Sequence, residues 1–117
     1  MSDLDLFRRE SDIIELQPEE ILFSHGDEAN AAYVITSGTV EIIVNNEVID
    51  VVGEGDIVGE MALIDDGVRS ATVRAKTIAH LARIDQKRFI FLIQQTPYFA
   101  LSVMRTMSER IRKMHER

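Results

Sequence analysis

The amino-acid sequence predicts a mainly β protein of the α+β class, in which an antiparallel roll or jelly roll is flanked by helices. Up to residue 84, short apolar runs with largely alternating polarity are separated by turns rich in glycine and asparagine, which is typical of sandwiches and barrels. From residue 85 onward the apolar period changes from two to that of a helix. These two observations together favour a β-roll followed by helices.

The predicted elements follow one another with short connections. A short helical stretch over residues 3–10 comes first. The turns at residues 37–38 and 45–46 predict two tight hairpins, and the glycines within residues 53–59 predict a loop. Strand character is found at residues 13–16, 21–23, 32–36, 39–44, 47–52, 70–76 and 78–84.

Two helices complete the predicted order. Asp85 suits the N-cap position of a helix over residues 86–95, which carries one apolar stripe. Pro97 in the first turn, with Thr96 as cap, predicts a final helix that runs towards the C-terminus. Such stripes most often pack on the core, although the spacing of one set in the final helix, 4, 3, 4, 3, is that of a coiled-coil seam. The set comprises Ala100, Met104, Met107, Ile111 and Met114.

Composition limits the class of protein. Hydrophobic residues make up 45% and charged residues 28% of the 117 residues, so we expect residues 1–117 to form a single globular domain. No apolar run has the length of a membrane span, and the N-terminus is acidic where a signal peptide would be basic, so we expect a cytoplasmic protein without membrane contact. The absence of cysteine excludes disulfides and cysteine-ligated iron–sulfur clusters.

Charge is unevenly distributed along the chain. Residues 1–67 contain 17 acidic residues and 2 arginines, whereas residues 68–117 contain 11 basic and 3 acidic residues. The acidic half would repel nucleic acid and would also repel a free phosphate ester. Any anion site must therefore create its own local positive field, while most of the basic half is expected to be a solvated helix face.

Residues 59–73 are the most informative segment. Gly59 allows a close approach of backbone to ligand, and the unpaired N–H groups at the start of the helix-forming run after it would point their positive ends at an anion. Arg69, ten residues later, would supply the formal charge, since a guanidinium offers two parallel donors to two phosphate oxygens. These residues predict a site for a small phosphate ester.

This segment resembles the phosphate-binding cassette of the cyclic nucleotide-binding domain family, which occurs in catabolite-activator-type regulators, kinase regulatory subunits and cyclic-nucleotide-gated channels. The resemblance implies an eight-stranded β-roll with terminal helices: an N-terminal helix at residues 1–10, the roll at 12–84 with the cassette at 59–73, and C-terminal helices at 85–117. One departure is Val68, where many relatives carry proline.

The resemblance also assigns ligand-binding roles. It implies that Arg69 pairs with the exocyclic oxygens of a cyclic phosphate and that Glu60 accepts a hydrogen bond from the ribose 2′-hydroxyl. Ser70, by hydroxyl or backbone N–H, and Ala71, by backbone N–H, would close the phosphate site. The expected ligand-binding residues are Gly59, Glu60, Met61, Ala62, Arg69, Ser70 and Ala71, and the candidate lid residues over the base are Arg105, Arg110 and Met114.

Cyclic AMP is the expected ligand, and cyclic GMP is the alternative. Within the family, alanine after the cassette arginine is typical of cyclic AMP binders and threonine of cyclic GMP binders, and Ser70 is intermediate. A serine at this position also occurs in bacterial cyclic AMP regulators, which favours cyclic AMP. No cofactor besides this ligand is expected.

Three classes of function stay open from the sequence. The first is a sensor that binds a cyclic nucleotide without chemistry and moves its last helix about a hinge at residues 94–97. The second is a nucleotide-independent dimerisation or partner-docking scaffold, against which the intact Glu60 and Arg69 argue. The third is a roll-fold enzyme or metal protein, which is disfavoured because the three histidines are widely separated and no Ser/His/Asp arrangement is visible.

The expected partners follow from the sensor hypothesis. They are a cyclic nucleotide, a second copy of the chain paired through the seam of the final helix, and an effector protein or domain outside these residues. Catabolite-activator-type regulators carry a helix-turn-helix after this domain. The present sequence ends at Arg117 within the expected lid helix, so no binding of nucleic acid through these residues is expected.

Overall fold

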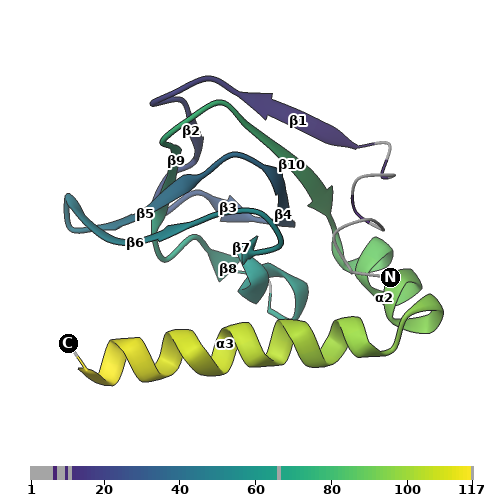
Figure 1. Cartoon of the computed structure of the whole chain (residues 1–117). Coiled ribbons are helices and arrows are strands. Elements are labelled where there is room, and N and C mark those ends of the chain that lie inside the picture. The colour runs from purple at the N-terminus through teal and green to yellow at the C-terminus, as the bar shows by residue number, and fades with distance from the viewer. Residues whose placement is uncertain (1–6, 8–9, 11, 66, 117) are drawn as a thin grey trace.

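The computed structural model describes residues 7, 10, 12–65 and 67–116, apart from the side chains of residues 114–116. Within these residues the chain forms a roll of antiparallel strands with two helices packed along one side (Figure 1). The expected helix over residues 3–10 lies mostly outside the described residues, although Phe7 is helical.

The roll consists of two four-stranded sheets and one small two-stranded sheet. The first sheet has the order β1 (Ile13–Leu16), β10 (Ala79–Ile84), β4 (Ala32–Ser37) and β7 (Ile57–Val58). The second has the order β2 (Ile21–Phe23), β9 (Thr72–Ala75), β5 (Val40–Val44) and β6 (Glu47–Val52). The small sheet pairs β3 (Glu28–Ala29) with β8 (Gly67–Val68). The two larger sheets confirm the predicted eight-stranded roll.

The long strands form where apolar residues alternate, and the predicted strands at residues 13–16, 21–23 and 47–52 have the observed bounds. The prediction of a loop without a strand over residues 53–59 was wrong, because β7 lies there and pairs with β4. The sequence also gave no sign of the pairing between β3 and β8. Both errors concern strands of two residues, which are too short to show an alternating pattern. The predicted hairpin at residues 37–38 was also wrong, because β4 and β5 lie in different sheets, whereas the hairpin at residues 45–46 joins β5 to β6.

Three helical segments follow or interrupt the roll: η1 (Glu60–Leu63), α2 (Gln86–Gln95) and α3 (Tyr98–Glu116). Asp85 caps α2 as predicted, since its side chain accepts a hydrogen bond of 2.8 Å from the backbone N–H of Arg88. η1 is a single 3₁₀ turn where the sequence predicted a short helix. No helix in the described part of the chain is long and apolar enough to cross a membrane.

The buried residues form two clusters, one inside the roll and one between the roll and the helices. In the second cluster Leu63 of η1 packs together with Leu92 of α2 and with Phe99 and Val103 of α3. Phe7 joins this cluster, and its ring centroid lies 4.9 Å from that of Phe99. Both helices therefore share one apolar cluster with η1, which belongs to the segment predicted to bind an anion.

The predicted seam of α3 is only partly buried against the roll. Met107 packs against the core cluster, whereas Met104 and Ile111 are 55% and 56% exposed. The seam therefore lies at the border of the buried face of α3, with Met107 on the side towards the roll and Met104 and Ile111 on the side towards solvent. Leu101, Met104 and Ile111 form the exposed apolar stripe of α3, and the side chain of Met114 lies outside the described residues.

Candidate anion-binding site

Arg69 is buried, with 5% of its surface exposed, between β8 and β9. Its Nη2 donates a hydrogen bond of 2.7 Å to the carbonyl oxygen of Ala31, and its Cζ lies 4.0 Å from the ring centroid of Phe23. Its Nε is buried and has no hydrogen-bond partner among the described residues. No carboxylate of the described residues forms an ion pair with Arg69, so its charge is available to a ligand.

The buried surroundings of Arg69 disfavour an unpaired positive charge on its guanidinium. Burial lowers the pKa of its guanidinium by removing water, whereas the nearby Tyr33 and Asp27 raise the pKa. Arginine nevertheless stays protonated in proteins. A buried cation with an unsatisfied N–H costs free energy that an anion bound beside it would recover. This is the electrostatic requirement for a phosphate site.

The backbone at Gly59 comes close to Arg69. Gly59 has a φ of +70°, and a Cβ added there would lie 2.5 Å from Nη1 of Arg69 and 3.3 Å from the ring of Phe23. Only glycine combines this left-handed conformation with so close an approach. Gly59 is also the N-cap of η1, so the amides of Glu60 and Met61 begin the helix without intrahelical partners.

A turn near the N-terminal end of the chain holds the backbone of Arg69. Its N–H donates a 2.7 Å hydrogen bond to the carbonyl oxygen of Asp27, and its carbonyl oxygen accepts one of 2.8 Å from the N–H of Gly26. The pairing of β3 with β8 continues this contact. Sequence reasoning missed this support because the two segments are far apart in the chain.

Glu60 is buried beside the arginine site and is paired with α3. Arg110 donates through Nη1 to Glu60 Oε2 and through Nη2 to the carbonyl oxygen of Ile57. Lys113 Nζ forms a second, more exposed contact of 2.9 Å with Asp50 Oδ2 on β6. These two ion pairs hold the second half of α3 against the roll and the predicted cassette.

The predicted site residues are only partly brought together. Gly59 contacts Arg69, and Ala62 is buried in the adjoining turn of η1. Met61 is 54% exposed, and Ser70 is also exposed. Ala71 packs against the cluster inside the roll and leads into β9.

Of the three candidate lid residues, only Arg110 contacts a site residue in the described structure. Arg105 is exposed, and the side chain of Met114 lies outside the described residues. The ion pair between Arg110 and Glu60 was not predicted from the sequence. The available signal was that Arg110 lies three and seven residues after Met107 and Val103, on the helix face that packs on the roll.

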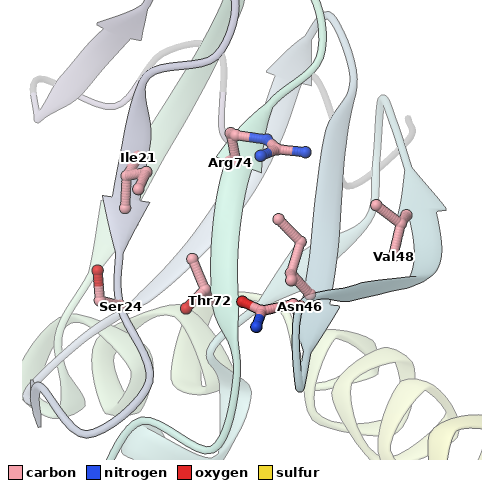
Figure 2. Close-up of a pocket in the computed structure, with 7 residues that line it drawn as sticks. Ile21, Ser24, Asn46, Val48, Thr72 and Arg74 are labelled. Carbon is pink, nitrogen blue, oxygen red and sulfur yellow. The ribbon is translucent and has the colours of Figure 1, made fainter.

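Apart from the Arg69 site, a concavity lies on the outer face of the second sheet, opposite the buried side chain of Val73 (Figure 2). Its volume is about 320 Å³, and Arg74 reaches into it from β9. Arg74 already forms an ion pair of 3.1 Å with Glu41, so its charge is compensated, unlike that of Arg69. The residues that line it are Ile21, Ser24, Ile43, Asn46, Val48, Thr72 and Arg74.

Comparisons with known proteins identify the family of the chain. The model of the cyclic nucleotide-binding domain family matches residues 13–96. The cAMP-activated global transcriptional regulator CRP of Salmonella typhimurium is 30% identical over 120 residues, which cover 97% of this chain and 57% of that protein. The cAMP-dependent protein kinase regulatory subunit of Schizosaccharomyces pombe is 36% identical over 95 residues, which cover 76% of this chain and 23% of that protein.

A solved structure shows the same likeness in three dimensions. The c-di-GMP responsive global regulator CLP of Xanthomonas campestris has a TM-score of 0.82 and 25% identity to this chain. The match covers 97% of this chain and 60% of that one. The present chain therefore spans little more than half the length of the bacterial regulators that it matches.

Proposed function

The chain belongs to the cyclic nucleotide-binding domain family, and from that premise we propose that residues 1–117 act as one sensory domain whose ligand is a cyclic nucleoside monophosphate. The observation that carries the proposal is the buried guanidinium of Arg69, which has a free Nε and no carboxylate partner among the described residues. A cyclic phosphate diester would give Arg69 the anion that it lacks.

The charges of the site favour a ligand with one negative charge. Arg110 neutralises Glu60, which leaves Arg69 as the uncompensated cation of this group. A cyclic nucleoside monophosphate carries one negative charge, whereas a 5′-monophosphate carries nearly two and would bring an unpaired charge into a buried site. Because of this charge balance, the site would bind a cyclic nucleoside monophosphate more tightly than a 5′-monophosphate.

The carboxylate of Glu60 retains one oxygen for the ribose. Arg110 occupies Oε2, and no described residue donates to Oε1. A ribose 2′-hydroxyl could donate to Oε1 while the ion pair with Arg110 remains in place. Ser70 is exposed next to Arg69 and would supply a further donor to the phosphate.

We propose cyclic AMP as the preferred ligand. Two of the relatives described above carry cAMP in their names, and Ser70 is compatible with this choice. The structural relative named as responsive to c-di-GMP makes that dinucleotide a necessary competitor in any test. No group in the proposed mechanism performs chemistry on the ligand, so the protein acts by binding.

Binding of the nucleotide would cause a rearrangement of α3. Leu63 in the cassette belongs to the same apolar cluster as Phe99 and Val103, and Glu60 is paired with Arg110, so a shared core and an ion pair both join the cassette to this helix. A shift of the cassette towards the bound phosphate would disturb both contacts. The connection between α2 and α3, around Thr96 and Pro97, is the candidate hinge.

The proposed partners are a second copy of the chain and an effector. Leu101, Met104 and Ile111 leave an apolar stripe of α3 exposed, which a parallel α3 of a second copy would cover. The alternative function is a scaffold that dimerises or docks a partner without nucleotide. That function would need no unpaired cation at position 69.

Isothermal titration calorimetry tests the proposal. Cyclic AMP, cyclic GMP, c-di-GMP and 5′-AMP are titrated into the wild type, Arg69→Lys and the matched control Arg74→Lys. Arg69→Lys should weaken cyclic AMP binding by about 2–4 kcal/mol, because lysine cannot donate bidentately, and Arg74→Lys should change it by less than about 0.5 kcal/mol. Absence of heat with every nucleotide at millimolar concentration would favour the scaffold, and an unaffected Arg69→Lys would show that Arg69 is not the anion site.

A further inference from the structure

Three polar side chains outside the anion site form a line across the first sheet. Glu15 of β1 stands directly opposite His80 of β10, and His80 stands directly opposite Ser37 at the end of β4. His80 Nε2 lies 2.9 Å from Glu15 Oε1, and His80 Nδ1 lies 2.8 Å from Ser37 Oγ. Binding of a nucleotide at Arg69 uses none of these residues.

For a neutral His80, the hydrogen bonds assign the proton positions in this line. A carboxylate can only accept, so the neutral imidazole of His80 carries its proton on Nε2 and donates it to Glu15. Nδ1 then accepts the hydroxyl proton of Ser37. A nucleophile, a base and an orienting carboxylate lie within hydrogen-bond reach, with the two ring nitrogens exchanged relative to serine hydrolases.

The backbone around Ser37 fixes this arrangement. The register of β4 and β10 shifts between His80 and Leu81, and such bulges re-aim side chains. Thr36 Oγ1 donates to the carbonyl oxygen of His80 at 3.1 Å. Gly38, which follows Ser37, has a φ of +82°, and a Cβ there would lie 2.1 Å from a backbone oxygen. Ser37 is held at a strand end that cannot shift easily.

The line is open to solvent. The side chains of His80 and Glu15 are 40% and 55% exposed, whereas the neighbouring Ala79 and Leu81 are fully buried, so His80 faces out of the roll. Figure 1 shows β1 on the side of the molecule opposite α3. A reagent can therefore reach Ser37 without competing for the Arg69 site.

We propose that Ser37 is a site of covalent acylation by small activated esters or thioesters. Ser37 Oγ attacks the acyl carbon while its proton passes to His80 Nδ1. The new Oγ–C bond forms as the bond from the acyl carbon to the leaving oxygen or sulfur breaks, and the leaving group takes the proton from His80. The products are an O-acyl serine and an alcohol or thiol, and the step requires no oxidant or metal.

The neighbouring charges favour an acyl donor over a phosphoryl donor. The carboxylate of Glu15, bonded to His80, repels an anionic phosphoryl group, but it does not repel the carbonyl group of a neutral ester. Gln17 Nε2 donates to the other oxygen, Glu15 Oε2, at 3.0 Å and adds no charge. Glu15 is a positioning residue, since it acts on Ser37 only through His80.

The full chain is incubated with p-nitrophenyl acetate, and acetylated residues are quantified by peptide mass spectrometry. Ser37 should react at least about tenfold faster than the exposed Ser70, and His80→Gln should slow its acetylation about 100-fold. Glu15→Gln should slow it about tenfold and Glu15→Asp should retain most of the rate, a difference that a purely structural carboxylate would not produce. A neutral thioester, S-phenyl thioacetate, tests the thioester source, and it should also acetylate Ser37 at a rate that His80→Gln lowers.

Thermal melting of each variant separates loss of reactivity from loss of fold. If His80→Gln does not fold, the comparison of Glu15→Gln with Glu15→Asp decides the question. Acetylation of Ser37 at the rate of Ser70, or an unchanged rate in a folded His80→Gln, overturns the proposal and leaves the line as a cross-strand contact only.

Discussion

Arg110 of α3 donates a hydrogen bond to the buried carboxylate of Glu60, which lies 50 residues earlier in the chain. The same guanidinium donates to the carbonyl oxygen of Ile57 at the start of β7. One side chain thus joins the C-terminal helix to both the roll and the cassette. The charge on Glu60 and the position of α3 are consequently linked.

Loss of Arg110 should destabilise the protein. In Arg110→Met the buried Glu60 is left without its charged partner, so the free energy of unfolding should fall by about 2–3 kcal/mol. The matched control is Lys113→Met, whose pair with Asp50 has a lysine that is 58% exposed and should contribute less than about 1 kcal/mol. Urea unfolding followed by circular dichroism measures both values. Equal losses in the two variants would show that the pair with Glu60 is not energetically special.

Glu60→Gln tests the contact with ribose. Wild-type protein should bind 2′-deoxy cyclic AMP more weakly than cyclic AMP by about 1.5–3 kcal/mol, since a hydrogen bond to a charged oxygen is lost. In Glu60→Gln the difference between the two ligands should shrink, because a neutral amide accepts a weaker bond. Calorimetry with both ligands measures it. Equal losses of affinity for the two ligands would contradict the assigned role.

Gly59→Ala should impair both stability and binding. Its methyl group would lie 2.5 Å from Nη1 of Arg69, and its φ of +70° is unfavourable for alanine. We expect a loss of about 1–2 kcal/mol in unfolding free energy and at least a tenfold loss of cyclic AMP affinity. The measurements are thermal unfolding and calorimetry.

Alanine substitutions at two other glycines distinguish the effect of backbone strain from that of steric displacement of Arg69. Gly55 also has a positive φ, of +86°, but nothing lies within 4 Å of an added Cβ, so Gly55→Ala should lose stability and keep affinity. Gly67→Ala has open space and no positive φ, and it should change neither property by much. A normal affinity in Gly59→Ala would mean that the close approach to Arg69 does not shape the site.

Much of the fold could be predicted because local patterns determine it. Alternating polarity located the long strands, and Asp85 with the residues after it located α2. The strands of two residues escaped prediction because they are produced by tertiary pairing, as between β3 and β8. The partial exposure of the α3 seam could not be predicted, because residue spacing does not tell how the helix is rotated against the roll.

The candidate site was only partly predictable. Gly59 and Arg69 belong to one short segment, so their proximity is a local property that a motif can capture. The supports of that segment come from elsewhere: Ala31 and Asp27 hold Arg69, and Arg110 holds Glu60. Likewise, the line of Glu15, His80 and Ser37 arises only when three strands lie in register. Such long-range contacts leave no spacing signal in a single sequence.

The exposed stripe of α3 predicts ligand-sensitive dimerisation. Met104 and Ile111 are more than half exposed, so replacing both by glutamate should leave the monomer folded and remove self-association through this face. Ile78→Glu is the control, since it adds the same charge at an exposed residue just before β10. Two heptads form a marginal coiled coil, so cyclic AMP should increase the dimer fraction of the wild type if it repositions α3. Analytical ultracentrifugation with and without ligand measures this, and a dimer that persists in Met104→Glu/Ile111→Glu would place the interface on another surface.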